Sequence, residues 1–567
     1  MQIIRQYFSF LLRSLLRTVG YALAFVALVT IVPVLGVALG IPAWVLSRFR
    51  AGKRVLDGIF NAGIWLAGVI PFVRKPVNRY VIDQVSSISR PRPHPFTLWS
   101  PHKEQPDPKD LLDYSTWPGL VDKRYTAIHL PLASIETRYP DLDKVATLFK
   151  RDGEGVPEKR STVLFTFFAQ WLTDSFLRTD PLDYRKNTSN HEVDMCQIYG
   201  LRESTARVLR SMEGGKLRSQ LINGEEFPPF LFEAPGTYAS GFEDLPYVGV
   251  LPGIYKNLDA DKRERTFLFA GGLERANTTI GYSAYNTLFL REHNRVCDEL
   301  ARACPSWDDE RLFQTARMIL IVQLVKIVVE DYIRHISGVT FPLTTDPTFA
   351  EEKIWYRPNW ITAEFDLLYR WHAMIPNTVR INGEDLPPTK FMLNNEPLTE
   401  LGLGRIFDDM ARQCAGKAGL FNTPDFLLPA ERAAVEQARQ SRLRSFNEYC
   451  VAFGQKPLKS FAQLTSDVRV QQRLQDLYGD MDQLEFFIGL FAQEAQGKRL
   501  HGDLLSSMVA CDAFSQTLTS PLLSRNLFHE GTFSDVGMEI IANTSTVEDV
   551  FRRNVRNAER YKATFDL

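Results

Sequence analysis

The stretch from Gly20 to Leu46 contains no charged residue, and it restricts the N-terminal part of the chain more than any other feature. About 20 apolar residues suffice for a helix to cross a bilayer, whereas the apolar region of a cleaved signal peptide is shorter. We therefore expect residues 1–57 to form a transmembrane anchor, with a signal peptide as the alternative. Basic residues flank the stretch on both sides, and their slight excess after it gives a small preference for a cytoplasmic location of the rest of the chain.

The rest of the chain divides into three further parts by composition. Gly58–Phe72 is apolar but too short to span a bilayer, so residues 58–88 are expected to lie in the membrane interface, with a juxtamembrane amphipathic linker as the alternative. Residues 89–110 are rich in proline and read as an extended connector. Residues 111–567 show long helical patterns and few strand signals, which predicts one mainly α-helical domain.

Composition excludes some classes of protein. The 567 residues are 23% charged and 45% hydrophobic, and the net charge is -1, so the sequence has no electrostatic signature of nucleic-acid binding. Six cysteines are scattered without a CxxC pair, which gives no support for a zinc site. Sparse cysteines fit a reducing compartment, or one where disulfides are not needed.

Ile361–Pro376 carries the residues with the clearest chemical potential. Its apolar and aromatic residues recur at the spacing of one helical face, and the proline ends the run, so we expect a single helix. Tyr369 and His372 are three residues apart and would share a face. A histidine on an apolar face is a candidate metal or haem ligand. The alternative is a core helix whose histidine and tyrosine are simply hydrogen-bonded.

This segment, Tyr-Arg-Trp-His followed by a proline, resembles the proximal-haem helix of the peroxidase–cyclooxygenase superfamily. The cyclooxygenase-like blocks occur in the expected order at Phe165–Asp180, Leu290–Leu300, Lys326–Gly338, Ser445–Gly454 and, more weakly, Thr532–Ile541. The resemblance extends over about Ile70–Val555. It implies a mainly α, animal haem-peroxidase-like fold with N-terminal membrane helices, a haem b (iron) cofactor and a homodimer. Arg370 departs from animal cyclooxygenases and is similar to the haem fatty-acid dioxygenases.

The resemblance assigns roles on the proximal side. His372 matches the ligand of the haem iron, and Tyr369 matches the tyrosine whose radical removes a hydrogen atom from the lipid before O₂ adds. Tyr332 matches the tyrosine that hydrogen-bonds the radical tyrosine. Ser515 approximately matches a serine of the substrate channel.

On the distal side the sequence departs from the family. Gln170 matches the glutamine of the distal motif, but Asp174 stands where the family has histidine. The distal imidazole moves a proton between the two oxygens of a hydroperoxide, which requires a group that titrates near neutrality. Asp174 is therefore either a substitute acid/base, if burial makes it a usable acid, or a sign that peroxidase activity is degraded or strongly altered. We favour the second interpretation.

The expected channel mouth also departs from the family. Cyclooxygenases hold the fatty-acid carboxylate with an arginine and a tyrosine, and the matching positions are Val85 and Val339. A buried carboxylate without a cationic partner is costly. Either Arg79 or Arg90 replaces the lost anchor, or the substrate is an esterified or neutral lipid, or a fatty acid bound in another orientation. Prostaglandin formation is therefore not expected.

Two other features are interpreted as structural. Arg291, Glu292, His293 and Arg295 are expected to pair within a buried polar network, and His191 is not expected to bind a metal.

Three functional hypotheses follow. The first is a membrane-bound, haem-dependent dioxygenase that inserts O₂ into an unsaturated fatty acid or other lipid through a tyrosyl radical. The second is a haem peroxidase that uses Asp174 and small reductants with peroxide. The third is a haem- or lipid-binding relative without turnover. Retention of Tyr369 beside His372 argues against the third, because binding alone does not need that tyrosine.

Overall fold

The structure, a computed structural model, describes residues 71–88, 122–134, 136–248, 251, 263–338, 341–356 and 361–567. The expected membrane span Gly20–Leu46, the connector 89–110 and Val339 lie outside these residues. The chain divides into two compact units, Met1–Val81 with Val339–Pro342, and Ile82–Gly338 with Leu343–Leu567. Most of the described residues belong to the second unit.

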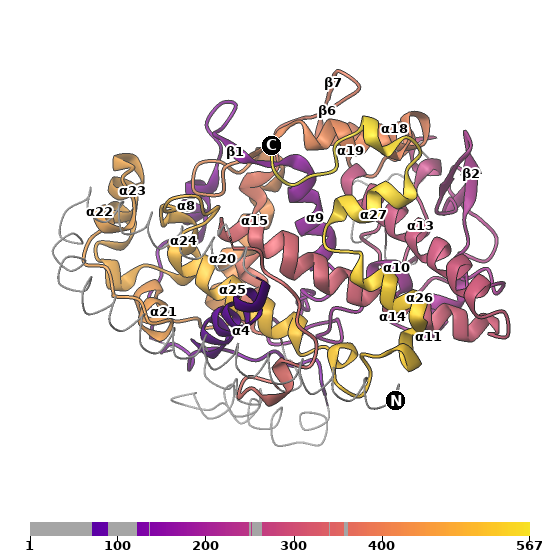
Figure 1. The fold of residues 1–567 in the computed structure, drawn as a ribbon. Coiled ribbons are helices and arrows are strands. Elements are labelled where there is room, and N and C mark those ends of the chain that lie inside the picture. Colours follow the sequence, from indigo (N-terminus) through magenta and orange to yellow (C-terminus); the bar gives the residue numbers. More distant parts are fainter. Residues whose placement is uncertain are drawn as a thin grey trace, which may run out of the picture. The chain divides into compact units, whose positions relative to one another are not determined.

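The described residues are mainly helical, as the sequence predicts (Figure 1). Helix α4 (Pro71–Ile88) begins in the first unit and ends in the second. The helices of the second unit are α8 (Leu142–Ala146), α9 (Val163–Thr173), α10 (Cys196–Tyr199), α11 (Glu203–Leu209), α13 (Ile280–Ala303), α14 (Asp309–Ile327), α15 (Ile333–Ser337), α16 (Ala363–Leu368), α17 (Pro388–Phe391), α18 (Glu396–Leu401), α19 (Leu403–Ala411), α20 (Leu428–Gln440), α21 (Phe446–Ala452), α22 (Phe461–Leu464), α23 (Val468–Tyr478), α24 (Phe486–Ala492), α25 (Asp503–Leu518), α26 (Glu530–Ala542) and α27 (Val547–Asn554).

Strands within the described residues form only two-stranded antiparallel sheets. The pairs are β1 (Pro157–Thr162) with β8 (Cys414–Gly416), β2 (Gln220–Ile222) with β3 (Glu225–Phe227), β4 (Phe232–Ala234) with β5 (Thr237–Tyr238), and β6 (Val379–Ile381) with β7 (Glu384–Leu386). In the first sheet Pro157 pairs with Gly416 and Thr162 with Cys414, with an irregularity between them. This sheet joins the start of α9 to the segment that follows α19.

Helix α13 is the centre of the second unit and packs against α9, α14, α19, α26 and α27 (Figure 1). The side chain of Thr279 caps its first turn by accepting a hydrogen bond from the Tyr282 N–H at 3.2 Å. In the part of the chain that the structure describes, one helical run, Asp309–Ser337, is long and apolar enough to cross a membrane. Because 78% of its apolar window is buried inside the protein, it has the character of a core helix.

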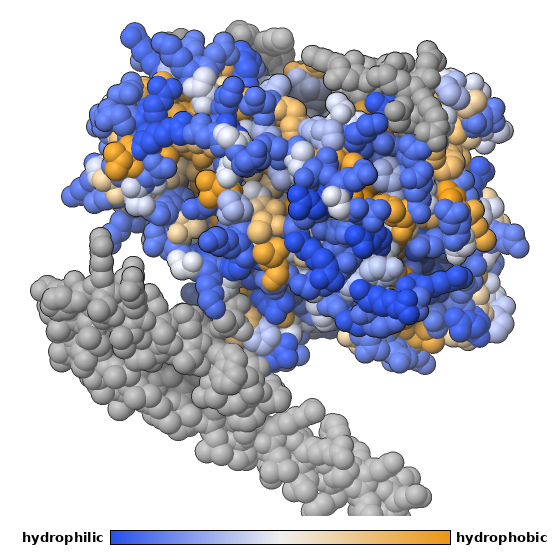
Figure 2. Space-filling view, turned by 90° about the horizontal axis from the view of Figure 1, so that it is seen from above, coloured by the Kyte–Doolittle hydropathy of each residue, from blue (hydrophilic) through white to orange (hydrophobic). Residues whose placement is uncertain are grey.

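The surface contrasts with this core. On the face drawn in Figure 2, hydrophilic residues dominate and hydrophobic residues gather in small separate groups, which is ordinary for a folded domain. All six cysteines are free thiols, and four of them are buried. The fold of the described residues is therefore held by packing and polar contacts rather than by disulfides.

The expectation of a single helix over Ile361–Pro376 is wrong. Helix α16 ends at Leu368, and a separate 3₁₀ turn, η7 (His372–Met374), follows. In a continuous helix the Leu368 carbonyl would accept from the His372 N–H; here it accepts from the Trp371 indole N–H at 2.6 Å. Sequence periodicity indicates which residues are buried. It does not reveal that a side chain, here the Trp371 indole, donates to a carbonyl that would otherwise accept a helical backbone hydrogen bond.

A second boundary also falls earlier than expected. The pattern predicts a helix over Phe165–Leu177, but α9 ends at Thr173 and Asp174 caps it. The chain leaves the helix through turns in which the Leu177 N–H still donates to the Thr173 carbonyl at 2.8 Å. Asp174 therefore lies at a helix end instead of within a helical face.

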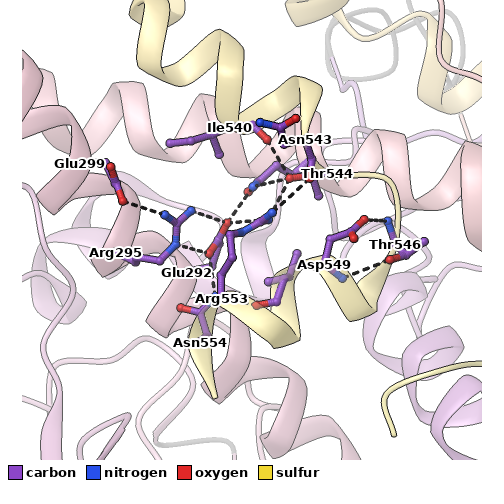
Figure 3. Close-up of polar contacts among 12 residues, drawn as sticks. Glu292, Arg295, Glu299, Ile540, Asn543, Thr544, Thr546, Asp549, Arg553 and Asn554 are labelled. Carbon is purple, nitrogen blue, oxygen red and sulfur yellow. Dashed lines mark hydrogen bonds and ion pairs between the residues drawn. The ribbon is translucent and has the colours of Figure 1, made fainter. Parts of the chain in front are cut away.

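Glu292 is the centre of a buried polar network that only partly matches the one expected from the sequence (Figure 3). Of the four expected members, Arg295 joins Glu292, whereas Arg291 pairs with Glu225 and His293 contacts Tyr199 and the Gly215 carbonyl. The Glu292 side chain is fully buried and accepts from Arg295 at 2.8 and 3.0 Å, Arg553 at 3.0 Å, Asn554 at 2.7 Å and Gln323 at 2.8 Å. Burial acts to raise the pKa of Glu292, but the hydrogen bonds from Arg295 and the charge of Arg553 outweigh it and lower the pKa. One carboxylate thus joins α13, α14 and α27.

We predict that Glu292→Gln lowers the free energy of unfolding by about 3–5 kcal/mol, because breaking a buried ion pair leaves an uncompensated charge. Glu548→Gln is the control, since the exposed pair that Glu548 makes with Arg552 contributes about 1 kcal/mol or less. Because the folded pKa of Glu292 is lowered, its stabilisation is present above the unfolded value of 4.5 and is lost as the pH falls through the folded pKa. Chemical denaturation at neutral and acidic pH measures both effects. Equal losses in the two variants would contradict the assignment.

Candidate functional site

The turn that carries His372 is fixed by contacts from the neighbouring loops. The Arg151 guanidinium donates to the carbonyls of Ala373 at 3.0 Å and Ile375 at 2.6 Å. Gly416 approaches the same turn so closely that an added Cβ would lie 2.1 Å from the Ala373 carbonyl oxygen. The backbone around His372 therefore has little freedom.

His372 faces a buried carboxylate that sequence reasoning missed. Its Nδ1 lies 3.2 Å from Oε1 of Glu431, and the side chains of His372 and Glu431 are 20% and 1% exposed. Nδ1 and Oε1 are close enough for a hydrogen bond, but their geometry is not that of one, so Nδ1 is buried without a hydrogen-bond partner. The other carboxylate oxygen, Oε2, is also buried without a partner. With Nδ1 directed at Glu431, Nε2 on the other side of the ring is the nitrogen left for a metal ion. No sequence motif marks Glu431.

Tyr369 lies at the end of α16 and is surrounded by aromatic rings. Its ring centroid is 5.3 Å from that of Phe365 and 4.8 Å from that of Trp371. Burial raises the pKa of the Tyr369 phenol, and the charge of Asp512 adds to this rise. The Tyr369 side chain is therefore a neutral phenol at physiological pH.

Tyr332 lies against the same aromatic group. It ends η5 (Val328–Tyr332), a π-helical turn, and its ring stacks on Phe165 at 5.3 Å and on Trp371 at 6.5 Å. Burial raises the pKa of Tyr332, and neighbouring Tyr369 raises it further. The two hydroxyls are close enough for a side-chain hydrogen-bond interaction that acts on the pKa of both phenols, although the Tyr332 hydroxyl makes no hydrogen bond of regular geometry.

Ser515 and Asp512 lie on α25, which packs against α16. Ser515 is buried and its hydroxyl donates to the Asp512 carbonyl at 3.1 Å. The Asp512 carboxylate contacts Nε2 of His129 at 3.0 Å and accepts from the Thr362 hydroxyl at 3.3 Å. This buried histidine–aspartate pair, which influences Tyr369, was not foreseen from the sequence because its members are distant in the chain.

The distal candidates form a second cluster. Gln170 Oε1 accepts from the Thr279 hydroxyl at 3.1 Å, and Asp174 Oδ1 accepts from Arg275 Nη1 at 2.8 Å. Asp174 is 7% exposed. Arg275 was missed by sequence reasoning, although it precedes a helix that the family motif marks. Asp174 thus has a cationic partner and makes a charge-assisted hydrogen bond, an arrangement unlike that of a neutral imidazole.

Aromatic contacts hold the two clusters in one region. Phe165, in the first turn of α9, stacks on Trp371 at 6.2 Å. Phe176, just beyond the end of α9, stacks on Phe365 of α16 at 5.9 Å. The helix that carries Gln170 is thereby joined at both ends to the segment that carries Tyr369.

The expected channel mouth is only partly described. Val85 is half-buried on α4, and Val339 lies outside the described residues. Two residues before Val85, the Asp83 carboxylate accepts from the Trp355 indole at 2.9 Å and from Lys353 Nζ at 3.0 Å. Lys353 is therefore already paired with an acid.

His191 has a structural role, as expected. Its Nε2 contacts the Lys123 carbonyl at 2.9 Å, and its Nδ1 accepts from the Ile361 N–H at 3.0 Å. Burial lowers the pKa of His191 to about 4, so the ring is neutral. Both nitrogens are occupied by backbone groups, and the ring positions the start of the segment leading to α16.

The sequence and the fold of this chain are similar to those of several known proteins. Prostaglandin G/H synthase 2 of Equus caballus is 32% identical over 510 residues, which are 87% of this chain and 79% of that protein. Prostaglandin G/H synthase 1 of Rattus norvegicus is 30% identical over 530 residues, 90% of this chain and 83% of that protein. The fold matches the fatty acid alpha-dioxygenase of Oryza sativa with a TM-score of 0.64 at 18% identity, covering 91% of this chain and 96% of that one. Peroxidase A of Dictyostelium discoideum matches with a TM-score of 0.59 at 17% identity, covering 76% and 91%.

The family model for animal haem peroxidases matches residues 175–565. This family implies a haem cofactor, and the proximal residues fit one: an imidazole whose Nδ1 faces a buried carboxylate presents Nε2 as a ligand, the usual arrangement of a metal-binding histidine. The orphaned Nδ1 and the partial exposure of an otherwise enclosed His372 side chain agree with this fit. The chain belongs to the animal haem peroxidase family, with homology to the prostaglandin G/H synthases.

Proposed function

We propose that this protein is a haem-dependent dioxygenase that inserts O₂ into an unsaturated fatty acid or other lipid through a radical on Tyr369. His372 would hold haem b through Nε2, and residues 1–88 would bring the enzyme to the bilayer that supplies the lipid. The observation that carries the proposal is the half-buried Tyr369 phenol, which lies three residues from His372 and packs against the rings of Phe365 and Trp371. Such a site protects a phenoxyl radical from water and from wasteful reactions.

The chain's own residues account for the steps after oxidation. Haem, when bound, supplies the oxidant for the neighbouring phenol. The Tyr369 phenoxyl then takes a hydrogen atom from a C–H bond of the lipid, and the carbon radical adds O₂. The resulting peroxyl radical takes a hydrogen atom from Tyr369, which gives a hydroperoxide and restores the phenoxyl. Trp371 and Tyr332 position the ring, so the protein contributes orientation and exclusion of water.

A second function, a peroxidase that uses Asp174, is favoured by one contact. Arg275 holds Asp174 beside Gln170 at the end of α9, so a polar group does occupy the distal position. The Asp174 oxygen that would exchange a proton with peroxide already accepts a charge-assisted hydrogen bond from Arg275, so it is less available for proton transfer than the imidazole of the family would be. We therefore expect this activity to be secondary to lipid oxygenation.

Tyr369→Phe tests the radical step. We predict that it abolishes oxygen uptake with an unsaturated lipid while haem binding is retained, because only the hydroxyl is removed. Tyr478→Phe, which removes a buried phenol that donates to Glu485, is the matched control and should retain uptake. An oxygen electrode with the haem-loaded, detergent-purified protein measures the rates.

Peroxide-dependent oxidation of a small phenol, followed in the same samples, separates the alternatives. If Tyr369→Phe leaves oxygen uptake intact, the radical mechanism is wrong. If oxygen uptake is absent from the wild type but phenol oxidation is rapid and survives Tyr369→Phe, the protein is a peroxidase.

Asp174→His restores the family residue at the distal position. We predict that it raises the rate of peroxide-dependent phenol oxidation at neutral pH by at least about tenfold, because general acid–base catalysis by a positioned group contributes roughly 10²–10⁴-fold. Asp298→His, a change at a surface carboxylate paired with Lys216, controls for an added histidine. Stopped-flow absorbance measures the rates. An unchanged rate in Asp174→His would show that Asp174 does not limit this activity.

We infer the substrate class from Val85, which matches the family position of the arginine that binds the fatty-acid carboxylate. An apolar residue at the position of the family's arginine favours a lipid without a free carboxylate. We predict that a free fatty acid and its methyl ester are oxygenated at similar rates, as measured by oxygen uptake at equal dispersed concentration. Strong preference for the free acid would contradict the neutral substrate.

A further inference from the structure

We infer that Glu431 is a positioning residue for His372: its carboxylate accepts the Nδ1–H of the proximal imidazole and strengthens that imidazole as a ligand of the haem iron. The inference rests on the proposed function in one respect, that haem binds through His372 Nε2. The inference goes beyond the proposed function because it assigns the residue that controls how strongly His372 donates electrons to the iron. Glu431 would thereby set the reduction potential of the haem.

The first support is the geometry of the pair. Nδ1 of His372 and Oε1 of Glu431 are 3.2 Å apart, and Glu431 is almost completely buried. Neither Nδ1 of His372 nor Oε2 of Glu431 has a hydrogen bond to any other residue. A small rotation of the imidazole, of the kind that accompanies ligand binding at Nε2, would align the Nδ1–H with the carboxylate. Catalytic hydrogen bonds are often poorly aligned before the partner is bound.

The second support is that the carboxylate is held in place. The Thr423 hydroxyl donates to Oε1 at 2.8 Å. Glu431 also lies in the first turn of α20, where the helix dipole favours a negative charge. A buried anion fixed by a hydroxyl and a helix terminus is an effective acceptor for an imidazole N–H.

The third support is a mechanical link between the two partners. The guanidinium of Arg151 donates to the carbonyls of Ala373 and Ile375 in the His372 turn, and its Nε donates to the Asn422 carbonyl at 2.7 Å. Asn422 precedes Thr423, whose hydroxyl holds the carboxylate. One side chain therefore fixes the spacing between the histidine turn and the loop that positions Glu431.

A purely structural role explains these facts less well. Leaving a buried carboxylate oxygen and a buried imidazole nitrogen without aligned partners lowers the stability of the folded chain. An apolar side chain of similar size would fill the space without that cost. The pair makes sense when the imidazole has a second ligand, because a carboxylate behind a metal-bound histidine fixes the orientation of the ring and raises its basicity.

Glu431→Gln is the first test, because it keeps the shape and removes the charge. In the haem-loaded protein we predict that the ratio of reduced to oxidised iron at a fixed potential rises at least tenfold, an upward shift of about 59 mV for one electron. The iron–histidine stretching frequency of the ferrous protein should fall. Glu436→Gln, at a half-exposed position of the same helix, is the control and should change neither quantity. Equal results for Glu431→Gln and Glu436→Gln would overturn the inference.

A second test does not need an intact proximal histidine. In His372→Gly, added imidazole can occupy the vacated position and restore the visible spectrum of the ligated haem, whereas 1-methylimidazole lacks the N–H that Glu431 would accept. We predict that the ratio of their dissociation constants favours imidazole at least tenfold more in His372→Gly than in His372→Gly/Glu431→Leu. The same ratio in both proteins would overturn the role of Glu431, even if Glu431→Gln alone were poorly folded.

The two tests separate this inference from the proposed function. If the wild type shows no haem band that depends on His372, the proposed function fails at its cofactor. If that band is present but the potential, the stretching frequency and the imidazole preference ignore Glu431, the cofactor assignment holds and the positioning role fails.

Discussion

The hydrogen bond from the Trp371 indole to the Leu368 carbonyl is the interaction on which the rest of the site depends. It ends α16 before Tyr369, so that the phenol points into an aromatic enclosure while His372 begins a new turn. A continuous helix would place both side chains on one face. The break instead gives Tyr369 the rings of Phe365 and Trp371 as neighbours and gives His372 the carboxylate of Glu431.

The two sides of the site are built by opposite electrostatic designs. On the proximal side the buried anion of Glu431 stands behind His372 and has no cationic side chain among its close contacts, only the Thr423 hydroxyl and the imidazole itself. On the distal side the anion of Asp174 is paired with Arg275. In the function that we propose, the first arrangement would enrich the haem ligand in electron density, and the second would keep Asp174 from acting as an acid/base. Together they favour oxidation of a neighbouring phenol over repeated proton transfer to peroxide.

The sequence predicts the helical class and the region of the site because burial periodicity and ordered motifs report packing. The roles of Tyr369, Tyr332 and Gln170, which the family motifs suggest, remain predictions. The helix break at Leu368 could not be predicted, because it depends on one indole taking a backbone acceptor. Glu431 was equally hidden: a glutamate in the first turn of a helix is common, and only the folded chain brings it to His372, far away in the sequence. The membrane span and Val339 remain predictions.

The central claim is that His372 holds haem. The most direct measurement is the visible absorption spectrum of the detergent-purified protein during haem titration, beside that of His372→Ala. The account predicts a saturable Soret band in the wild type that His372→Ala abolishes or strongly alters. A wild type without a specific band, or a band that ignores the substitution, would contradict it.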